Sequence, residues 1–203
     1  GAKPRVMAMN DGTANIAVDC VDDTFRECDY IFLCTPVEKN VEYLSLLKNI
    51  IKDDCIITDV GSVKSNIHAA IKKLNMEKNF IGGHPMAGSE KTGYEFSNDR
   101  LLENAYYPVT PTDSVDNKYV KEYSKIVSDI GAIPIEISYK EHDRVVAAVS
   151  HLPHLIASSL VNLVKHNDSP LEYMKTFAAG GFKDITRIAS SSPEMWEQIC
   201  MTN

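Results

Sequence analysis

The sequence predicts an α/β protein, in which a Rossmann-like parallel sheet is followed by an all-helical domain. In residues 1–138, short apolar runs alternate with amphipathic helical stretches, which is the pattern of a parallel α/β sheet. From residue 139 onward no strand-like run occurs and each segment has helical spacing. We therefore expect a dinucleotide-binding domain at 1–138 and a helical domain at 139–203, both incompletely represented.

Five strands are expected in the first domain. The runs "DYIFLCTP" and "CIITDVGS" are rich in Ile and Val and have the composition of fully buried strands. They contain Cys34 and Cys55, and none of the five cysteines forms a C-x-x-C pair. Buried free thiols in a reducing compartment, and hence a cytoplasmic location, fit this pattern best. The five strands are expected at residues 29–36, 55–62, 79–83, 106–111 and 133–138.

Helices are expected between these strands and throughout the second domain. Ser62 or Ser65 is a candidate N-cap, and Gly131 is a candidate helix stop. In the second domain, residues 141–166 form one long helical pattern in which Pro153 predicts a kink. The helices of the first domain are expected at residues 37–54, 62–74 and 116–131.

The N-terminal stretch lacks a feature that this fold normally has. Residues 1–20 have the pattern of the tail of a helix followed by a short strand. A dinucleotide-binding domain should open with a strand, G-x-G-x-x-G and a helix, and this motif is absent. We therefore expect an excised chain that binds cofactor poorly by itself, and the choice between NAD and NADP cannot be read from it.

Composition excludes several classes of partner. The net charge is −7, with no block of Lys or Arg, so nucleic acid is not expected as a partner. No apolar run approaches the roughly 20 residues that span a bilayer, so no membrane association is expected. His151 and His154 lie one helical turn apart but have no acidic or Cys partner at ligand spacing, so no metal site is predicted.

The loop "IGGHPMAGSEKTG" at 81–93 has three interpretations. Gly83 and Gly88 have the separation of a P-loop, but Ser89 stands where that loop needs Lys. A phosphate loop is therefore disfavoured. Because ligands bind outside the carboxyl ends of parallel strands, His84 at a strand end is instead a candidate proton acceptor. The alternative is a strand-end histidine bonded to the backbone.

Polar residues also follow the other expected strands. Thr35, Asp59 and Ser62 come at the ends of two of them, so we expect them in one crevice with His84. In the helical domain, "AGGFKDITRIA" places Asp184 and Arg187 after two glycines. Arginine binds carboxylates in a bidentate manner, although a solvated charged helix explains the same pattern.

Five motifs taken together resemble one family. "CTPV", "DVGSVK", "GGHPMAGSEKTG", "VVAAVSHLPH" and "GGFKDITRIA" occur in the order and spacing of prephenate dehydrogenases. The resemblance covers about residues 25–200. It implies an NAD(P)-dependent oxidoreductase of tyrosine biosynthesis, which converts prephenate to 4-hydroxyphenylpyruvate with loss of CO2. It also implies a homodimer formed through the helical domain.

The resemblance assigns roles to particular residues. His84 polarises or deprotonates the ring hydroxyl, and Ser62 bonds both this histidine and the substrate. Arg187 holds a substrate carboxylate and His151 lines the substrate pocket. Asp184 contributes near the dimer interface, while Ser89 and Glu90 shape the rim of the pocket. The residues implied to contact the nicotinamide half of the cofactor are Thr35, Pro36, Val37, Asp59 and Gly61.

Three alternatives stay open at this point. The first is arogenate dehydrogenase, which performs the same ring chemistry on a substrate that carries an amine. The second is another two-domain hydroxyacid dehydrogenase that uses a helical-domain lysine, although this leaves "GGHP" and "SHLPH" unexplained. The third is a catalytically inactive cofactor-binding or regulatory domain. Lysines available for the second alternative are Lys165, Lys175 and Lys183.

Overall fold

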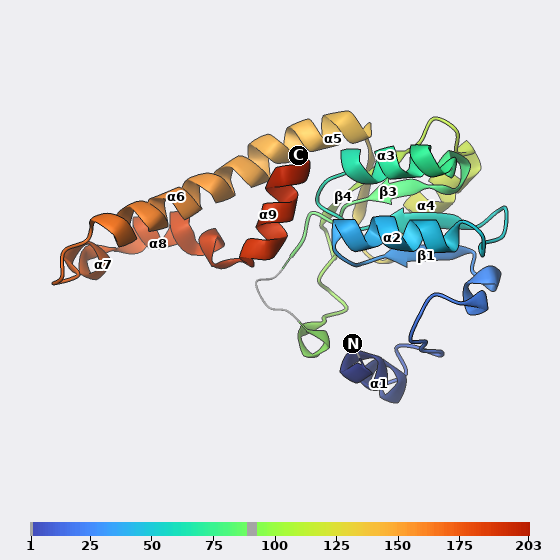
Figure 1. Cartoon of the computed structure of the whole chain (residues 1–203), viewed down its shortest axis with the longest axis horizontal. Helices are drawn as coiled ribbons and strands as arrows, with labels where there is room; N and C mark the ends of the chain where they lie inside the picture. The colour runs from blue at the N-terminus through green and yellow to red at the C-terminus, as the bar shows by residue number, and fades with distance from the viewer. Residues whose placement is uncertain (1, 89–92) are drawn as a thin grey trace. The chain divides into compact units, whose positions relative to one another are not determined.

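The computed structural model describes residues 2–88 and 93–203, except for the side chains of Ala2 and Val37. The chain divides into two compact units, Gly1–Tyr139 and Lys140–Asn203. The first unit contains the strands and the second is helical (Figure 1). The predicted class, a Rossmann-like sheet followed by a helical domain, is therefore confirmed.

All five predicted strands form. β1 pairs in parallel with β2, a single parallel bridge joins Ile57 of β2 to Phe80 just before β3, and β4 pairs in parallel with β5. The described strands thus form a two-stranded sheet, β1-β2, and a three-stranded sheet, β3-β4-β5, which this bridge joins in the order β1-β2-β3-β4-β5. Their bounds are Tyr30–Leu33 (β1), Ile56–Asp59 (β2), Ile81–Gly83 (β3), Tyr106–Pro111 (β4) and Ile133–Glu136 (β5).

One pairing differs from the expected parallel sheet, because β3 and β4 are antiparallel. A parallel pair needs a crossover connection, usually a helix, to bring the chain back to the same edge. In its described part, the connection from 84 to 105 contains only the 3-10 turn η3 (Tyr94–Phe96). The chain therefore re-enters the sheet from the edge at which β3 ended.

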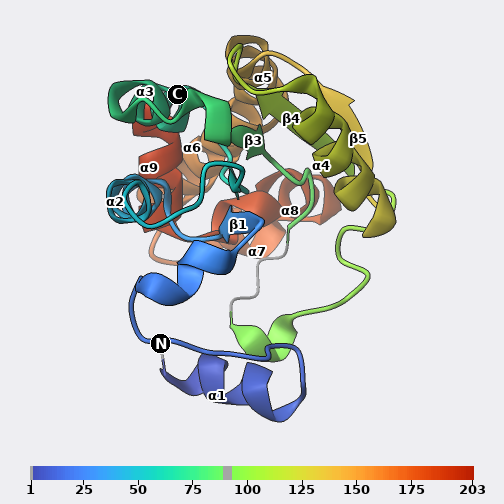
Figure 2. The same cartoon turned by 90° about the vertical axis from the view of Figure 1, so that its right-hand side faces the viewer.

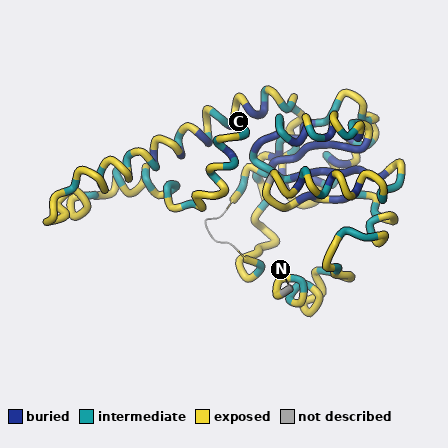
Figure 3. The backbone as a smooth tube through the Cα atoms, in the orientation of Figure 1, coloured by how far each residue is buried: buried dark blue, intermediate teal, exposed yellow. Residues whose placement is uncertain are grey.

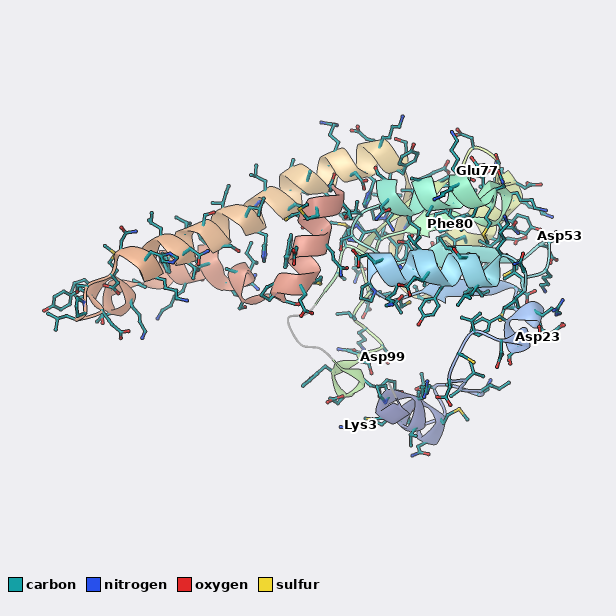
Figure 4. All side chains as sticks on the ribbon, in the orientation of Figure 1. Lys3, Asp23, Asp53, Glu77, Phe80 and Asp99 are labelled. Atoms are coloured by element: carbon teal, nitrogen blue, oxygen red, sulfur yellow. The ribbon has the colours of Figure 1, made fainter. Side chains whose placement is uncertain are left out.

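Helices cover both faces of the sheet (Figure 2). Because side chains alternate along a strand, Ile57 packs with α2 and α3, whereas the adjacent Ile56 packs with α4. Phe80 belongs to the first of these cores, while Asp53 lies at the rim of the unit (Figure 4). The helical elements of this unit are α1 (Ala2–Asn10), η1 (Asp23–Glu27), α2 (Val37–Leu47), α3 (Ser65–Leu74), η2 (Glu77–Asn79) and α4 (Asn117–Asp129).

Burial follows the prediction for β2 but not for β1. All of β2 is buried (Figure 3). In β1, however, Phe32 is 43% exposed, because β1 is an edge strand among those described and pairs only with β2. Cys55 is buried as predicted, but Cys34 is exposed because it lies in the loop beyond the strand.

Two further local predictions are wrong. No strand follows α1, and residues 11–22 have no regular structure. The cap of α3 is Lys64, and Ser65 is the first helical residue. By contrast, Gly131 ends the segment of α4 as predicted, with φ of +86°, a conformation that glycine adopts without steric cost.

The helical unit is built around one long helical stretch with an irregular middle. Tyr139–Val146 (α5) leads into a π-helical turn at Ala147–His151 (η4) and then into Leu152–Asn167 (α6). Pro153 has no N–H and its ring conflicts with the preceding turn, which explains the predicted irregularity. The remaining elements are α7 (Tyr173–Phe177), α8 (Gly180–Thr186), η5 (Arg187–Ser190) and α9 (Pro193–Thr202).

The stretch Tyr139–Asn167 is long and apolar enough to cross a bilayer by length and composition, although only 22% of its most apolar window is buried. Core helices of soluble proteins meet the same criterion. Much of its exposed apolar surface lies on α6. The exposed apolar side chains there are Leu152, Leu155, Ile156, Val161 and Leu163.

Candidate active site

The candidate site of the α/β unit lies at the carboxyl edge of its sheet. β1, β2 and the start of β3 run in the same direction, so Leu33, Asp59 and Gly83 end at one edge. Three loops leave this edge, and they carry Thr35, Ser62 and His84 respectively. The convergence expected from the sequence follows directly from these parallel pairings.

A buried ion pair joins two of these strand ends. Asp59 is 1% exposed and Lys64 is 0% exposed, and the Lys64 ammonium donates to the Asp59 carboxylate. Lys64 Nζ also donates to the carbonyl oxygen of Gly83 at 2.7 Å. The Asp59 carboxylate accepts from the N–H groups of Gly61 at 2.9 Å and Gly83 at 3.4 Å. The end of β2 and the end of β3 are thus held by one charged pair.

Gly83 is a glycine because there is no room for a side chain. A Cβ at this position would lie 2.6 Å from Tyr123 Oη and 2.9 Å from the backbone oxygen of Asp59. Tyr123 Oη lies 2.9 Å from Tyr107 Oη and accepts from Thr58 Oγ1 at 2.8 Å. Burial raises the pKa of Tyr107 to about 12, so this hydroxyl stays protonated at neutral pH.

His84 follows directly and is held by the neighbouring strand. Its backbone N–H donates to the carbonyl oxygen of Pro108 in β4 at 3.1 Å. The residue is 9% exposed, whereas Ser62 is half-buried in the loop before α3. Both residues therefore lie at the carboxyl edge where the sequence predicts them, and their catalytic roles stay predictions.

The residues predicted to contact a nicotinamide lie on the same edge. Thr35 Oγ1 donates to Asn40 Oδ1 at 2.6 Å, and Pro36 is the N-cap of α2, which Val37 begins. Gly61 is half-buried, and its N–H donates to the Asp59 carboxylate. The Asp59 carboxylate is bonded within the protein. Asp59 would therefore affect a nicotinamide only through the loop whose Gly61 N–H it binds.

In the helical unit, two histidines stack around the single tryptophan. The rings of His154 and Trp196 are stacked 3.5 Å apart, and the ring of His151 meets Trp196 edge-on at 5.9 Å. Asn203 Nδ2 donates to Nδ1 of His151 at 3.1 Å and to the carbonyl oxygen of Asp143 at 2.9 Å. An amide nitrogen only donates, so the neutral His151 ring carries its proton on Nε2.

Burial sets the charge of these histidines. Desolvation lowers the pKa of His151, opposed by the nearby Asp143 carboxylate, and it also lowers the pKa of His154. Both rings are therefore neutral at pH 7. Across residues 2–88 and 93–203, no group of three potential metal ligands occurs.

The other predicted substrate-binding residues that the structure describes are exposed, unlike His84 and His151. Asp184 in α8 and Arg187 at the start of η5 are exposed, so both are accessible to a ligand. Ser89 and Glu90, the predicted rim residues, lie outside the described residues.

The sequence reasoning missed Lys64 and the cluster around Trp196. For Lys64, the available signal was the pair of an Asp and a Lys five positions apart in "DVGSVK".

His142, whose Nδ1 lies 2.8 Å from the Asp143 carboxylate, influences the pKa of His151. A regular helix would place His142 and His151 on nearly opposite faces, because their spacing leaves them about half a turn apart around the helix axis. The π-helical turn between them accommodates an extra residue and shifts that register, which simple periodicity does not reveal.

Comparison with known proteins identifies both units. The family model described as "Prephenate dehydrogenase, nucleotide-binding domain" matches residues 5–136, and "Prephenate dehydrogenase, dimerization domain" matches residues 138–203. A curated prephenate dehydrogenase of Bacillus subtilis is 39% identical over 98% of this chain and 54% of its own length. The chain spans about half the length of this relative and of a curated prephenate dehydrogenase from Lactococcus lactis.

Solved structures agree with this assignment. Prephenate dehydrogenase from Aquifex aeolicus, in complex with hydroxyphenyl propionate and NAD+, matches with a TM-score of 0.91 at 34% identity, over 99% of this chain and 70% of the other. Arogenate dehydrogenase from Synechocystis matches with a TM-score of 0.85 at 27% identity, over 100% of this chain and 72% of the other.

Proposed function

The chain belongs to the prephenate dehydrogenase family, and from this premise we propose that it oxidatively decarboxylates prephenate to 4-hydroxyphenylpyruvate in tyrosine biosynthesis. The observation that carries the proposal is the position of His84. This histidine follows the last residue of β3, at the sheet edge that also presents Gly61 and Ser62. In open α/β sheets, that edge is where ligands bind.

His84 is the proposed base. A neutral imidazole accepts the proton of the ring hydroxyl, and Ser62 hydrogen-bonds this hydroxyl. Once a hydride has also left the carbon that bears this hydroxyl, loss of CO2 aromatises the ring, and the proton held by His84 can return to the phenolate oxygen. Because aromatisation drives the reaction, the protein mainly needs to orient the substrate and to supply this one base.

The cofactor is proposed to be NAD, which accepts the hydride from the substrate ring. The Aquifex aeolicus relative was solved with NAD+. Thr35, Pro36, Val37 and Gly61 would contact the nicotinamide half, since they border the same edge as His84. The sequence contains no G-x-G-x-x-G to hold a pyrophosphate, so no residue is proposed for that part.

The helical unit is proposed to recognise the anionic substrate. Arg187 is exposed, and its guanidinium can form a bidentate pair with a substrate carboxylate. His151 is proposed to line the pocket, Asp184 to contribute near the dimer interface, and Ser89 and Glu90 to form the rim.

We also propose a homodimer formed through the helical unit. The exposed apolar side chains of α6 suit burial against a second copy better than against lipid, because the same stretch contains His142, Asp143, His151 and His154. Ionisable side chains in a membrane interior cost several kcal/mol each. A cytoplasmic location stays a prediction. Sedimentation of the full-length protein tests the dimer, and a monomer at micromolar concentration would reject it.

The decisive experiment measures reduced cofactor with two substrates and two cofactors. The full-length protein is incubated with prephenate or arogenate, each with NAD+ or NADP+. We expect the highest kcat/KM with prephenate and NAD+, accompanied by release of CO2. Preference for arogenate would instead assign arogenate dehydrogenase activity, and the likeness to the Synechocystis arogenate dehydrogenase is the reason to test it. Absence of reduced cofactor in all four mixtures would reject the enzyme and favour a binding domain.

A further inference from the structure

We propose that Lys64 is a positioning residue that fixes His84 relative to the loop carrying Ser62. The inference rests on the function proposed above, because His84 and Ser62 are the two residues that it would align. Lys64 itself is fully buried and is assigned no contact with substrate or cofactor.

The Lys64 ammonium joins the ends of two strands. It donates to Asp59 at the end of β2 and to the carbonyl oxygen of Gly83 at the end of β3. Lys64 is also the N-cap of α3 and lies two residues after Ser62. One side chain therefore connects the segment carrying Ser62 to the residue immediately before His84.

The peptide between Gly83 and His84 is hydrogen-bonded at both of its polar atoms. The carbonyl oxygen of this peptide accepts from Lys64 at 2.7 Å, and its N–H donates to Pro108 at 3.1 Å. Because the peptide group is planar and includes the Cα of His84, these two bonds fix the plane from both ends. The Cα of His84, from which the imidazole side chain extends, is thus held by Lys64 on one side and by β4 on the other.

Stability alone is a weak reason to bury this pair. Removing two charges from water is expensive, and well-packed apolar residues of similar size are often as stable. The Asp59 carboxylate also accepts from the N–H of Gly83 at 3.4 Å, so both backbone polar groups of Gly83 are engaged by the pair. An apolar pair would fill the space but would bond neither group.

The test removes both charges together, so that neither is left buried without a partner. In the full-length protein, we expect Asp59→Asn/Lys64→Met to lower kcat for prephenate by about tenfold or more, since small misplacements of catalytic groups reduce rates steeply. KM should stay within about threefold. The matched control is Asp53→Asn/Lys78→Met, which makes the same substitutions in a pair at the surface of the same unit, and which should keep kcat within about twofold.

A second readout does not depend on turnover. The ring signals of His84 are assigned by NMR of protein with labelled histidine, through their loss in His84→Asn. We expect the double substitution to shift these signals, while those of the exposed His166 and the whole spectrum of the control stay unchanged. If the wild-type protein turns over neither prephenate nor arogenate, the proposed function fails, and the His84 signals still decide the positioning role.

The inference is overturned by a folded double variant, with the wild-type circular dichroism spectrum, that keeps both its kcat and its His84 signals. If methionine at position 64 prevents folding, Asp59→Asn/Lys64→Gln is measured instead. Its shorter amide does not extend as far as the lysine, so the same loss of kcat and the same shift are expected. Wild-type values in that variant would likewise overturn the inference.

Discussion

The Asp59–Lys64 pair of the α/β unit and the Trp196 cluster of the helical unit bury their polar groups in opposite ways. In the α/β unit, Asp59 and Lys64 form a charged pair whose atoms also bond the backbone of Gly61 and Gly83. In the helical unit, the buried groups include histidines, and Nδ1 of His154 and Nε1 of Trp196 have no hydrogen-bond partner among the described residues. The first arrangement is satisfied internally, whereas the second is not.

This difference separates two kinds of site. A fully bonded charged pair keeps one geometry, which suits a group that must be held in place for chemistry. Neutral buried histidines become charged as the pH falls, so their packing depends on pH. We therefore expect substitutions in the α/β unit to change rate and folding strongly, and those in the helical unit to change binding and pH dependence.

The largest effect should come from breaking the buried pair on one side only. Lys64→Met leaves the Asp59 carboxylate buried without its counter-ion, which costs about 3–5 kcal/mol of unfolding free energy. Urea unfolding followed by circular dichroism measures this loss. Lys78→Met is the control, since its pair with Asp53 is exposed and is worth about 1 kcal/mol or less. Equal losses in the two variants would contradict the contrast between buried and exposed pairs.

The next effect is on turnover. His84→Asn removes the proposed base while keeping a polar side chain of similar reach, so kcat should fall by about 100-fold or more. Steady-state kinetics on the full-length protein, with thermal unfolding as a check on folding, measure this change. His166→Asn, on the exposed surface of α6, should leave kcat unaltered. An unchanged kcat in His84→Asn would reject the base assignment.

How far the sequence predicts the molecule depends on whether a feature is local. The strands and helices follow from apolar periodicity, and Gly131 ends its helix as its position indicates. The gathering of Thr35, Ser62 and His84 follows from strand direction. The antiparallel return of β4 does not, because it depends on the path of a long connection.

Contacts between distant segments are also hidden from a local pattern. The bond from Lys64 to Gly83 spans 19 positions, and the stack of His154 on Trp196 joins α6 to α9. The sequence places each of these residues on an element but does not show which neighbour it meets. A π-helical turn makes this harder, because it moves His151 out of regular helical register.

A smaller effect should distinguish binding from chemistry. Arg187→Ala removes the proposed carboxylate partner, so KM for prephenate should rise by about tenfold while kcat stays within about threefold. Arg144→Ala is the matched control, since Arg144 is exposed in the same unit and pairs with Glu141 at the surface. If Arg187→Ala lowers kcat and leaves KM unchanged, the division of labour between the units is wrong.

The smallest effect concerns pH. Burial lowers the pKa of His154 below the ordinary value of 6.5, so above that value the folded and unfolded states bind the same number of protons at this site. As the pH falls below it, the unfolded state takes up the proton first, and the stability of the helical unit decreases until the folded ring is also protonated.

Trp196 is the only tryptophan and stacks on His154, so its emission reports this unit during thermal unfolding. Between about pH 7 and about pH 5, we expect His154→Gln to reduce the fall in unfolding temperature by about 2 °C, which corresponds to a change of under about 1 kcal/mol. His166→Gln removes an exposed histidine and should keep the wild-type slope. Identical slopes in all three proteins would show that burial of His154 does not couple its protonation to folding, and the contrast between the two units would then rest on the Asp59–Lys64 pair alone.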